Sequence, residues 1–199
     1  MANPTVIVPP LIFVRHGETD WNAAGRLQGH IDIALNDRGR EQARRNGIAI
    51  AEKFPDIATF DFVASPLGRA RETMEIIRAA LGLDPKAFRL ESRLREISHG
   101  DWEGSTGEEI ERSAPHLVAE RNANRWEFVP PNGESYRLLL ERLTPWLVAV
   151  ERPTVVVSHG GVGRVLRSHL LGVEPFPSIV TLFSQNNAFH WRDGTEALI

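Results

Sequence analysis

Short apolar runs alternate with longer stretches of helical periodicity along this chain. Residues 11–14, 62–64 and 154–157 are predominantly apolar, as in parallel strands that are buried on both faces. Helices are predicted from an Asn36 cap to about residue 54, from Pro66 after a Ser65 cap to about residue 81, and over residues 161–171. This alternation predicts an α/β fold, a three-layer α/β/α sandwich with a mostly parallel sheet, in a single domain over residues 1–199.

The pattern changes between about residues 93 and 135, where Gly, Glu and Arg are frequent and β-branched runs are few. A capping box from Thr106 to Glu109 opens a helix there, and residues 130–133 form a turn. We interpret this region as a small inserted lid over a pocket. A helix is expected next over about 134–150, which Pro145 should kink or break. Residues 88–90, 179–183 and 188–191 are further strand candidates, and residues 18–30 read as a loop.

Basic side chains stand just after the three buried strands. Arg15 and His16 follow the first, Arg69 follows the second, and His159 follows the third. In open α/β sheets, ligands bind outside the carboxyl ends of the strands. Arginine binds phosphate through two parallel hydrogen bonds, and histidine can be neutral or charged near pH 7. The simplest account is one pocket for a dianion, with a histidine as nucleophile or donor.

Four motifs in a fixed order carry a resemblance to a known family. They are Arg15-His16-Gly17-Glu18 with Asn22, Ser65-Pro66-Leu67-x-Arg69-Ala70, Leu94-x-Glu96, and Ser158-His159-Gly160-Gly161. Together they resemble the histidine phosphatase superfamily, which includes cofactor-dependent phosphoglycerate mutase. The resemblance implies a mixed sheet with one antiparallel edge strand.

The resemblance also implies roles for single residues. His16 would attack phosphorus and carry the phosphoryl group, while Arg15 and Arg69 clamp the phosphate and His159 donates to its oxygens. Asn22 and the backbone near Gln28 and Gly29 match positions that line the family's phosphate pocket. For Gln28 and Gly29, simple turn chemistry explains the residues equally well.

A leaving alkoxide needs a proton, and the candidates are Glu96, Asp101 and Glu103. Glu96 matches the acid position of the family. The other branch of the superfamily carries Asp directly after the second histidine, whereas this chain has Gly160 there. This difference favours Glu96 as the acid. Glu103 and Trp102 are expected to brace the loop.

Composition limits the remaining possibilities. The net charge of −3 gives no electrostatic case for nucleic acid, and we identify neither a signal peptide nor a membrane span. With no cysteine and no histidine at ligand spacing, we expect no metal and no cofactor, and a cytoplasmic location. The residues without a motif are expected to be exposed, solvated or capping: His30, His99, His116, His169, His190, Arg71, Arg78 and Arg93.

The sequence therefore predicts a metal-independent phosphomonoester hydrolase that acts on small phosphorylated metabolites. Phosphoglycerate mutase is the alternative, since Arg121 and Arg125 could make basic substrate contacts. A module that binds phosphorylated ligands without turnover is less favoured, because His16, Glu96 and His159 are all present. The natural substrate, the role of His99 and the choice between monomer and homodimer stay open.

Overall fold

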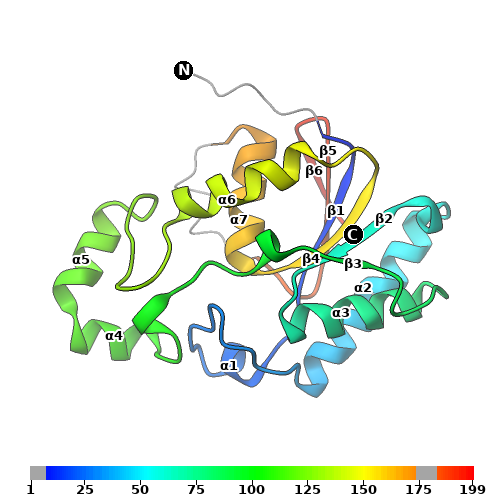
Figure 1. The fold of residues 1–199 in the computed structure, drawn as a ribbon. Helices are drawn as coiled ribbons and strands as arrows, with labels where there is room; N and C mark the ends of the chain where they lie inside the picture. The colour runs from blue at the N-terminus through cyan, green and yellow to red at the C-terminus, as the bar shows by residue number, and fades with distance from the viewer. Residues whose placement is uncertain (1–7, 174–182) are drawn as a thin grey trace.

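The computed structural model describes residues 8–173 and 183–199, which build one six-stranded sheet of order β3-β2-β4-β1-β5-β6 (Figure 1). Its strands are β1 (Leu11–Arg15), β2 (Asp61–Ala64), β3 (Arg89–Leu90), β4 (Thr154–Ser158), β5 (Ala188–Arg192) and β6 (Thr195–Leu198). The first four strands are parallel, and β5 runs antiparallel to both β1 and β6. The mixed, mostly parallel sheet is confirmed. The antiparallel strand is not the edge strand, however, because β6 pairs along its outer side.

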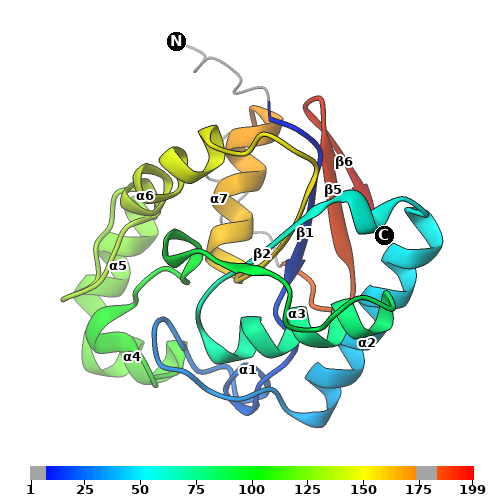
Figure 2. The ribbon, with the colours of Figure 1, turned by 45° about the vertical axis from the view of Figure 1, so that its right-hand side comes forward.

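Four helices cover the two faces of this sheet (Figure 2). They are α2 (Asp37–Lys53) and α3 (Gly68–Ala80) on one face, and α6 (Tyr136–Val148) and α7 (Gly160–Leu171) on the other. Side chains of β1 alternate between two cores. Leu11 and Phe13 pack with α6 and α7, whereas Ile12 and Val14 pack with α2 and α3. The three-layer sandwich is thus confirmed, with β1 and β4 buried at its centre.

The helix boundaries follow the sequence at some ends and depart from it at others. Asn36 caps α2 as predicted, because its side-chain oxygen accepts from the Gly39 N–H at 2.9 Å. The predicted start of α3 at Pro66 is wrong, since the helix begins at Gly68 and Ser65 does not cap it. The Gly68 N–H instead donates to Asp32 at 2.7 Å, so another loop satisfies the helix end.

The region between residues 93 and 135 contains short elements beside the sheet. They are η2 (Ser92–Leu94), η3 (Gly100–Trp102), α4 (Gly107–Ser113) and α5 (Pro115–Ala123). Figure 1 shows α4 next to α1 (Asp20–Ala23), and an Arg26–Glu109 ion pair of 2.9 Å joins these two parts of the chain. The predicted capping box of Thr106 and Glu109 is present, whereas the sequence did not predict α1 and α5.

Other expectations have mixed outcomes. The helix α6 continues through Pro145 to Val148 rather than breaking there. The expected strand over 179–183 lies outside the described residues except for Phe183. Arg78 is not solvated as expected, because it is 6% exposed and its guanidinium lies 4.3 Å above the Phe62 ring. Its Nε also donates to the Asp84 carbonyl oxygen at 2.7 Å.

Gly47 tests the close packing of α2 against α3. A Cβ atom at this position would lie 2.7 Å from the Cβ of Ala80 and 3.0 Å from the Ile77 carbonyl oxygen. Overpacking typically costs about 1–3 kcal/mol, whereas Ala gains about 1 kcal/mol over Gly in helix propensity. We therefore expect Gly47→Ala to lower the free energy of unfolding in urea by about 1 kcal/mol.

Gly107→Ala is the matched control, because a Cβ atom there meets nothing within 4 Å. This variant should be neutral or more stable by a few tenths of a kcal/mol, roughly as for unstrained Gly→Ala changes. Equal stabilisation of both variants would contradict the tight helix contact.

Candidate active site

The central strands bring the two motif histidines together. Arg15 and Ser158 end β1 and β4 in register, so His16 and His159 leave the sheet side by side. Their ring centroids are 5.1 Å apart. Arg69 reaches the same place from the first turn of α3. The structure therefore brings His16, His159 and Arg69 together beyond the carboxyl ends of the central strands, as predicted.

His16 is held in one tautomer. Its Nδ1 lies 2.7 Å from the Gly17 carbonyl oxygen. A carbonyl can only accept, so Nδ1 carries the proton and Nε2 keeps its lone pair. The pKa of His16 lies well below 6.5, first because of burial and then because of Arg69 and Arg15, which outweigh the Gly17 hydrogen bond. The imidazole is neutral at pH 7, with Nε2 able to act as a nucleophile.

A fully buried guanidinium group, that of Arg69, and a partly buried one, that of Arg15, stand beside this imidazole. Arg69 is fully buried and donates to the carbonyl oxygens of Ile31 at 2.7 Å and Gly29 at 2.8 Å. Arg15 donates to the Phe183 carbonyl oxygen at 2.8 Å. The Nε of each arginine is buried without a partner among the described residues.

Burial lowers the pKa of Arg15 to about 10, which still leaves this guanidinium charged at pH 7. Burial also lowers the pKa of Arg69. A buried donor without a partner costs about 1–3 kcal/mol, more when the group is charged. An anion bound between the two groups would relieve this cost.

His159 is oriented by Ser65. Its Nε2 lies 2.7 Å from the Ser65 hydroxyl oxygen, while its buried Nδ1 has no partner among the described residues. Burial, followed by Arg69 and His16, lowers the pKa of His159 well below 6.5. If the hydroxyl donates to Nε2, the neutral ring carries its proton on Nδ1, which matches the predicted donor role.

Asn22, Gln28 and Gly29, the residues predicted to line the phosphate pocket, make different contacts in the structure. Asn22 completes the capping box of the short helix α1, in which its side-chain oxygen accepts from the N–H of the N-cap residue Thr19 at 3.2 Å. The Gly29 carbonyl is occupied by Arg69, and a Cβ atom at Gly29 would lie 2.0 Å from a carboxylate oxygen of Glu103. Gln28 is buried, with its side-chain oxygen unpartnered among the described residues. Gly29 thus supports Arg69 through its backbone.

Of the three candidate acids, Glu96 has the best placement. One of its carboxylate oxygens accepts from the N–H groups of Ile97 at 2.9 Å and Gly161 at 3.0 Å, at the start of α7. Its charge acts on both Arg15 and Arg69. Asp101 is bound instead by the Asn132 amide at 3.0 and 3.1 Å.

Glu103 accepts from the backbone N–H groups of His30 and His99, each at 3.1 Å. These contacts are those of a residue that braces the loop, as expected.

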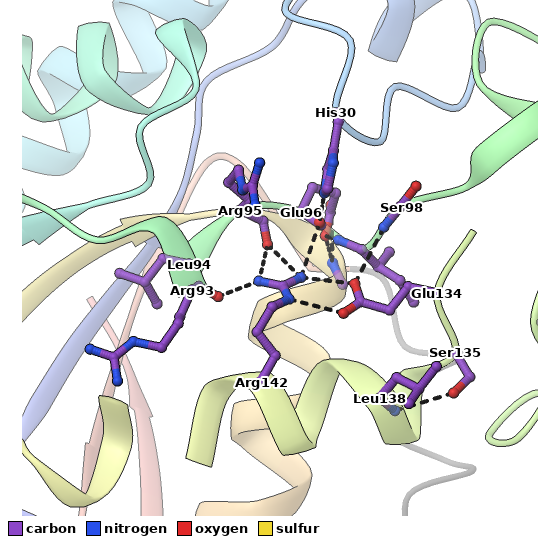
Figure 3. A network of polar contacts seen from close by, with 12 residues as sticks. His30, Arg93, Leu94, Arg95, Glu96, Ser98, Glu134, Ser135, Leu138 and Arg142 are labelled. Atoms are coloured by element: carbon purple, nitrogen blue, oxygen red, sulfur yellow. Dashed lines mark hydrogen bonds and ion pairs between the residues drawn. The ribbon is translucent and has the colours of Figure 1, made fainter. Parts of the chain in front are cut away.

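Sequence reasoning missed the support of the Glu96 segment. Arg142 of α6 donates to the carbonyl oxygens of Arg93, Arg95 and Glu96, and pairs with Glu134 at 2.8 Å (Figure 3). His30, expected to be exposed or capping, donates from Nε2 to the Glu96 carbonyl oxygen at 2.8 Å. No local motif marks either residue, because their partners are distant in sequence.

A basic cluster lies under the region that contains α4 and α5. His99, Arg121 and Arg125 line a cavity of about 30 Å³ together with Tyr136. Burial is the main cause that lowers the pKa of both His99 and Arg121, and the charge of Arg125 lowers the pKa of Arg121 further. His99 is therefore a partly buried residue of this cluster, at the N-cap position of η3.

An α/β/α sandwich that presents two neutral histidines and two arginines beyond the carboxyl ends of its central strands is suited to phosphoryl chemistry. The sequence model of the histidine phosphatase superfamily (branch 1) matches residues 11–188, and the chain belongs to this family of enzymes. The resemblance noted in the sequence is thereby confirmed.

Relatives and solved structures agree with the family. The chain is 34% identical to glucosyl-3-phosphoglycerate phosphatase of Mycobacterium tuberculosis over 94% of this chain and 88% of that protein. It is 40% identical to phosphoglycerate mutase-like protein 4 of Arabidopsis thaliana over 78% of this chain and 68% of that protein. The solved mycobacterial glucosyl-3-phosphoglycerate phosphatase with VO3 is similar at a TM-score of 0.75 and 30% identity, covering 96% of this chain and 97% of that chain.

Residues 8–173 and 183–199 contain neither a cluster of metal ligands nor a membrane-spanning helix. No group of three or more His, Cys, Asp or Glu side chains is placed to hold a metal ion. No helix in these ranges has the length and apolar character needed to cross a membrane.

The contact between Glu96 and α7 gives a test of the predicted acid. A Cβ atom at Gly161 would lie 2.5 Å from a Glu96 carboxylate oxygen. We expect Gly161→Ala to displace this carboxylate and lower kcat on glycerol phosphate by about tenfold to hundredfold, the range of a misplaced acid. The loss should be smaller on para-nitrophenyl phosphate, whose leaving group needs little protonation.

The neighbouring glycine is the control. A Cβ atom at Gly160 meets Arg15 at 3.5 Å, an ordinary contact, so Gly160→Ala should stay within about threefold of wild type. Equal activity of both variants would remove Glu96 from the acid role.

Burial of the two neutral histidines also predicts a pH dependence of stability. Their folded-state pKa values lie below the unfolded value of about 6.5, so the unfolded chain binds protons first as the pH falls. Stability is therefore complete above this value and decreases below it. Between about pH 7 and about pH 5.5, each histidine should remove about 1 kcal/mol from the free energy of unfolding.

The measurement is urea unfolding of wild type and His16→Asn at both pH values. The variant should lose about 1 kcal/mol less than wild type on acidification. Identical losses would show that His16 is not held neutral in the folded protein.

Proposed function

We propose that this protein is a metal-independent phosphomonoesterase that hydrolyses small phosphorylated metabolites through a phosphohistidine intermediate. The observation that carries the proposal is the state of His16. Its ring is neutral, its Nδ1 is bound to the Gly17 carbonyl oxygen, and its Nε2 has no partner among the described residues and lies beside the charges of Arg69 and Arg15. The relatives named as phosphatases support the reaction class. A cytoplasmic location is part of this proposal.

In the first step, Nε2 of His16 attacks phosphorus in line with the ester oxygen. The new P–N bond forms as the P–O bond breaks, and negative charge spreads over the three outer oxygens. Arg15 and Arg69 neutralise this charge, and the Asn22 amide and His159 Nδ1 donate hydrogen bonds. A protonated Glu96 gives its proton to the leaving alkoxide.

In the second step, the ionised Glu96 accepts a proton from water, which attacks the phosphohistidine. The P–N bond breaks, inorganic phosphate leaves, and His16 returns to the neutral tautomer fixed by Gly17. The segment over about 93–135 would act as the lid over this site. No step needs a metal, so activity should survive chelation by EDTA.

The intermediate can be trapped. Rapid quenching with phosphorus-labelled substrate should give one label per chain that is stable in base and labile in acid, and peptide mapping should place it on His16. His16→Ala should abolish both label and turnover, because His159, the other neutral imidazole of the site, has its Nε2 against the Ser65 hydroxyl and carries its proton on Nδ1. His159→Ala should slow turnover by roughly a hundredfold or more, as for loss of a transition-state donor, without moving the label.

Label on any other residue would contradict the proposal. Single-step inversion at a chiral phosphorus would do so as well, because two successive displacements give overall retention.

Phosphoglycerate mutase is the second candidate, and the basic cluster of His99, Arg121 and Arg125 favours it. Arg121 and Arg125 repel one another, and an acidic group of the substrate would relieve that repulsion. Product analysis with 3-phosphoglycerate and 2,3-bisphosphoglycerate separates the candidates. A phosphatase releases inorganic phosphate at each turnover, whereas a mutase forms 2-phosphoglycerate without net release.

A further inference from the structure

The segment that leads into β5 touches the phosphoryl site at several points. Phe183 accepts the hydrogen bond of Arg15 through its carbonyl oxygen. The side-chain nitrogen of Gln185 lies 3.1 Å from the carbonyl oxygen of His16 and 3.1 Å from the side-chain oxygen of Asn22. One amide therefore contacts both the backbone of the nucleophile and a predicted phosphate ligand.

The orientation of both amides is fixed by their partners. The carbonyl oxygen of His16 can only accept, so the Gln185 atom beside it must be the NH2 group. The Thr19 backbone N–H can only donate, so the Asn22 atom beside it must be the oxygen. The two hydrogens of Gln185 Nε2 thus serve one acceptor each. The Asn22 Nδ2 then remains as a donor, with no acceptor among the described residues.

Buried amides of α2 hold this segment in place. Asn46 donates to the Gln185 carbonyl oxygen at 3.2 Å, and Gln42 donates to the Asn186 side chain at 3.0 Å. The other end of the Gln42 amide accepts from the Glu18 N–H at 2.8 Å. Gln42 and Asn46 are 3% and 2% exposed. The Gln185 segment and the His16 loop are therefore fastened to the same helix.

We propose that Gln185 is a positioning residue for phosphoryl transfer, which aims the Asn22 NH2 group at the phosphoryl oxygens and fixes the backbone of His16. The inference rests on the proposed function of this site. Gln185 acts through Asn22, since its donor joins the Thr19 N–H and hydroxyl on the Asn22 oxygen and helps them to keep the amide from turning over. A turned amide would present an oxygen to the dianion, replacing attraction by repulsion.

A double-mutant cycle on kcat/KM for para-nitrophenyl phosphate tests this coupling. We expect Gln185→Met to lower kcat/KM by roughly tenfold or more, the loss expected from a misdirected transition-state donor. In the Asn22→Ala background the same change should cost less than about threefold, because the group it acts through is gone. A purely structural role of Gln185 would give the same factor in both backgrounds.

Binding of orthovanadate, measured by calorimetry, gives a second readout that needs no turnover. Gln185→Met should weaken vanadate binding by a factor close to its loss in kcat/KM, since vanadate adopts the geometry of the transition state. If wild type binds vanadate yet hydrolyses no phosphomonoester, the proposed function fails, and the vanadate cycle still decides the role of Gln185.

Ser184→Ala is the matched control in the same segment. Its hydroxyl accepts only from the Asn186 N–H among the described residues, at 3.0 Å, so activity should stay within about threefold of wild type. Should Gln185→Met fail to fold, Gln185→Leu carries the same cycle, because it removes both donors and adds no charge. Near-wild-type activity and vanadate affinity of a folded Gln185 variant would overturn the inference, as would equal losses in both backgrounds.

Discussion

The hydrogen bond from His16 Nδ1 to the Gly17 carbonyl oxygen is the interaction on which the active site depends. It is 2.7 Å long and buried, and it assigns the proton to Nδ1 and the lone pair to Nε2. Burial and the charges of Arg69 and Arg15 keep the ring neutral. The same two cations would attract a phosphate dianion, so the surroundings that prevent protonation of His16 also favour binding of its target.

The loop that contains His16 and Gly17 packs closely against the helices on one face of the sheet. A Cβ atom at Gly17 would lie 2.2 Å from the Gly39 carbonyl oxygen, so Gly17 is required by contact with α2 rather than by contact with a ligand. The Gly17 N–H donates to Thr73 of α3 at 3.0 Å. Both helices on one face of the sheet thus fix the residue whose carbonyl orients His16. Rigid elements support the catalytic geometry, as precise positioning requires.

Much of this arrangement could be predicted from the sequence because its signals are local. Arg15 and His16 follow an apolar strand directly, and the glycines after His159 mark the start of α7. The missed parts depend on contacts between distant segments. Arg142 and Gln185 bond to groups far away in the chain, with nothing in their own neighbourhood to mark them. The prediction for the start of α3 is wrong for a related reason, since the closest partner of the Ser65 hydroxyl is His159 at 2.7 Å, which is distant in sequence, and the Leu67 N–H lies farther from it at 3.4 Å.

The central claim, that His16 attacks through Nε2 while Gly17 holds Nδ1, is tested most directly by nuclear magnetic resonance. The trapped phosphoenzyme would be prepared with nitrogen-15 in its histidines, and the phosphorus–nitrogen coupling would identify the bonded atom. The account predicts phosphorus on Nε2 of His16 and a proton still on Nδ1. Phosphorus on Nδ1 of His16, or on either nitrogen of His159, would contradict it.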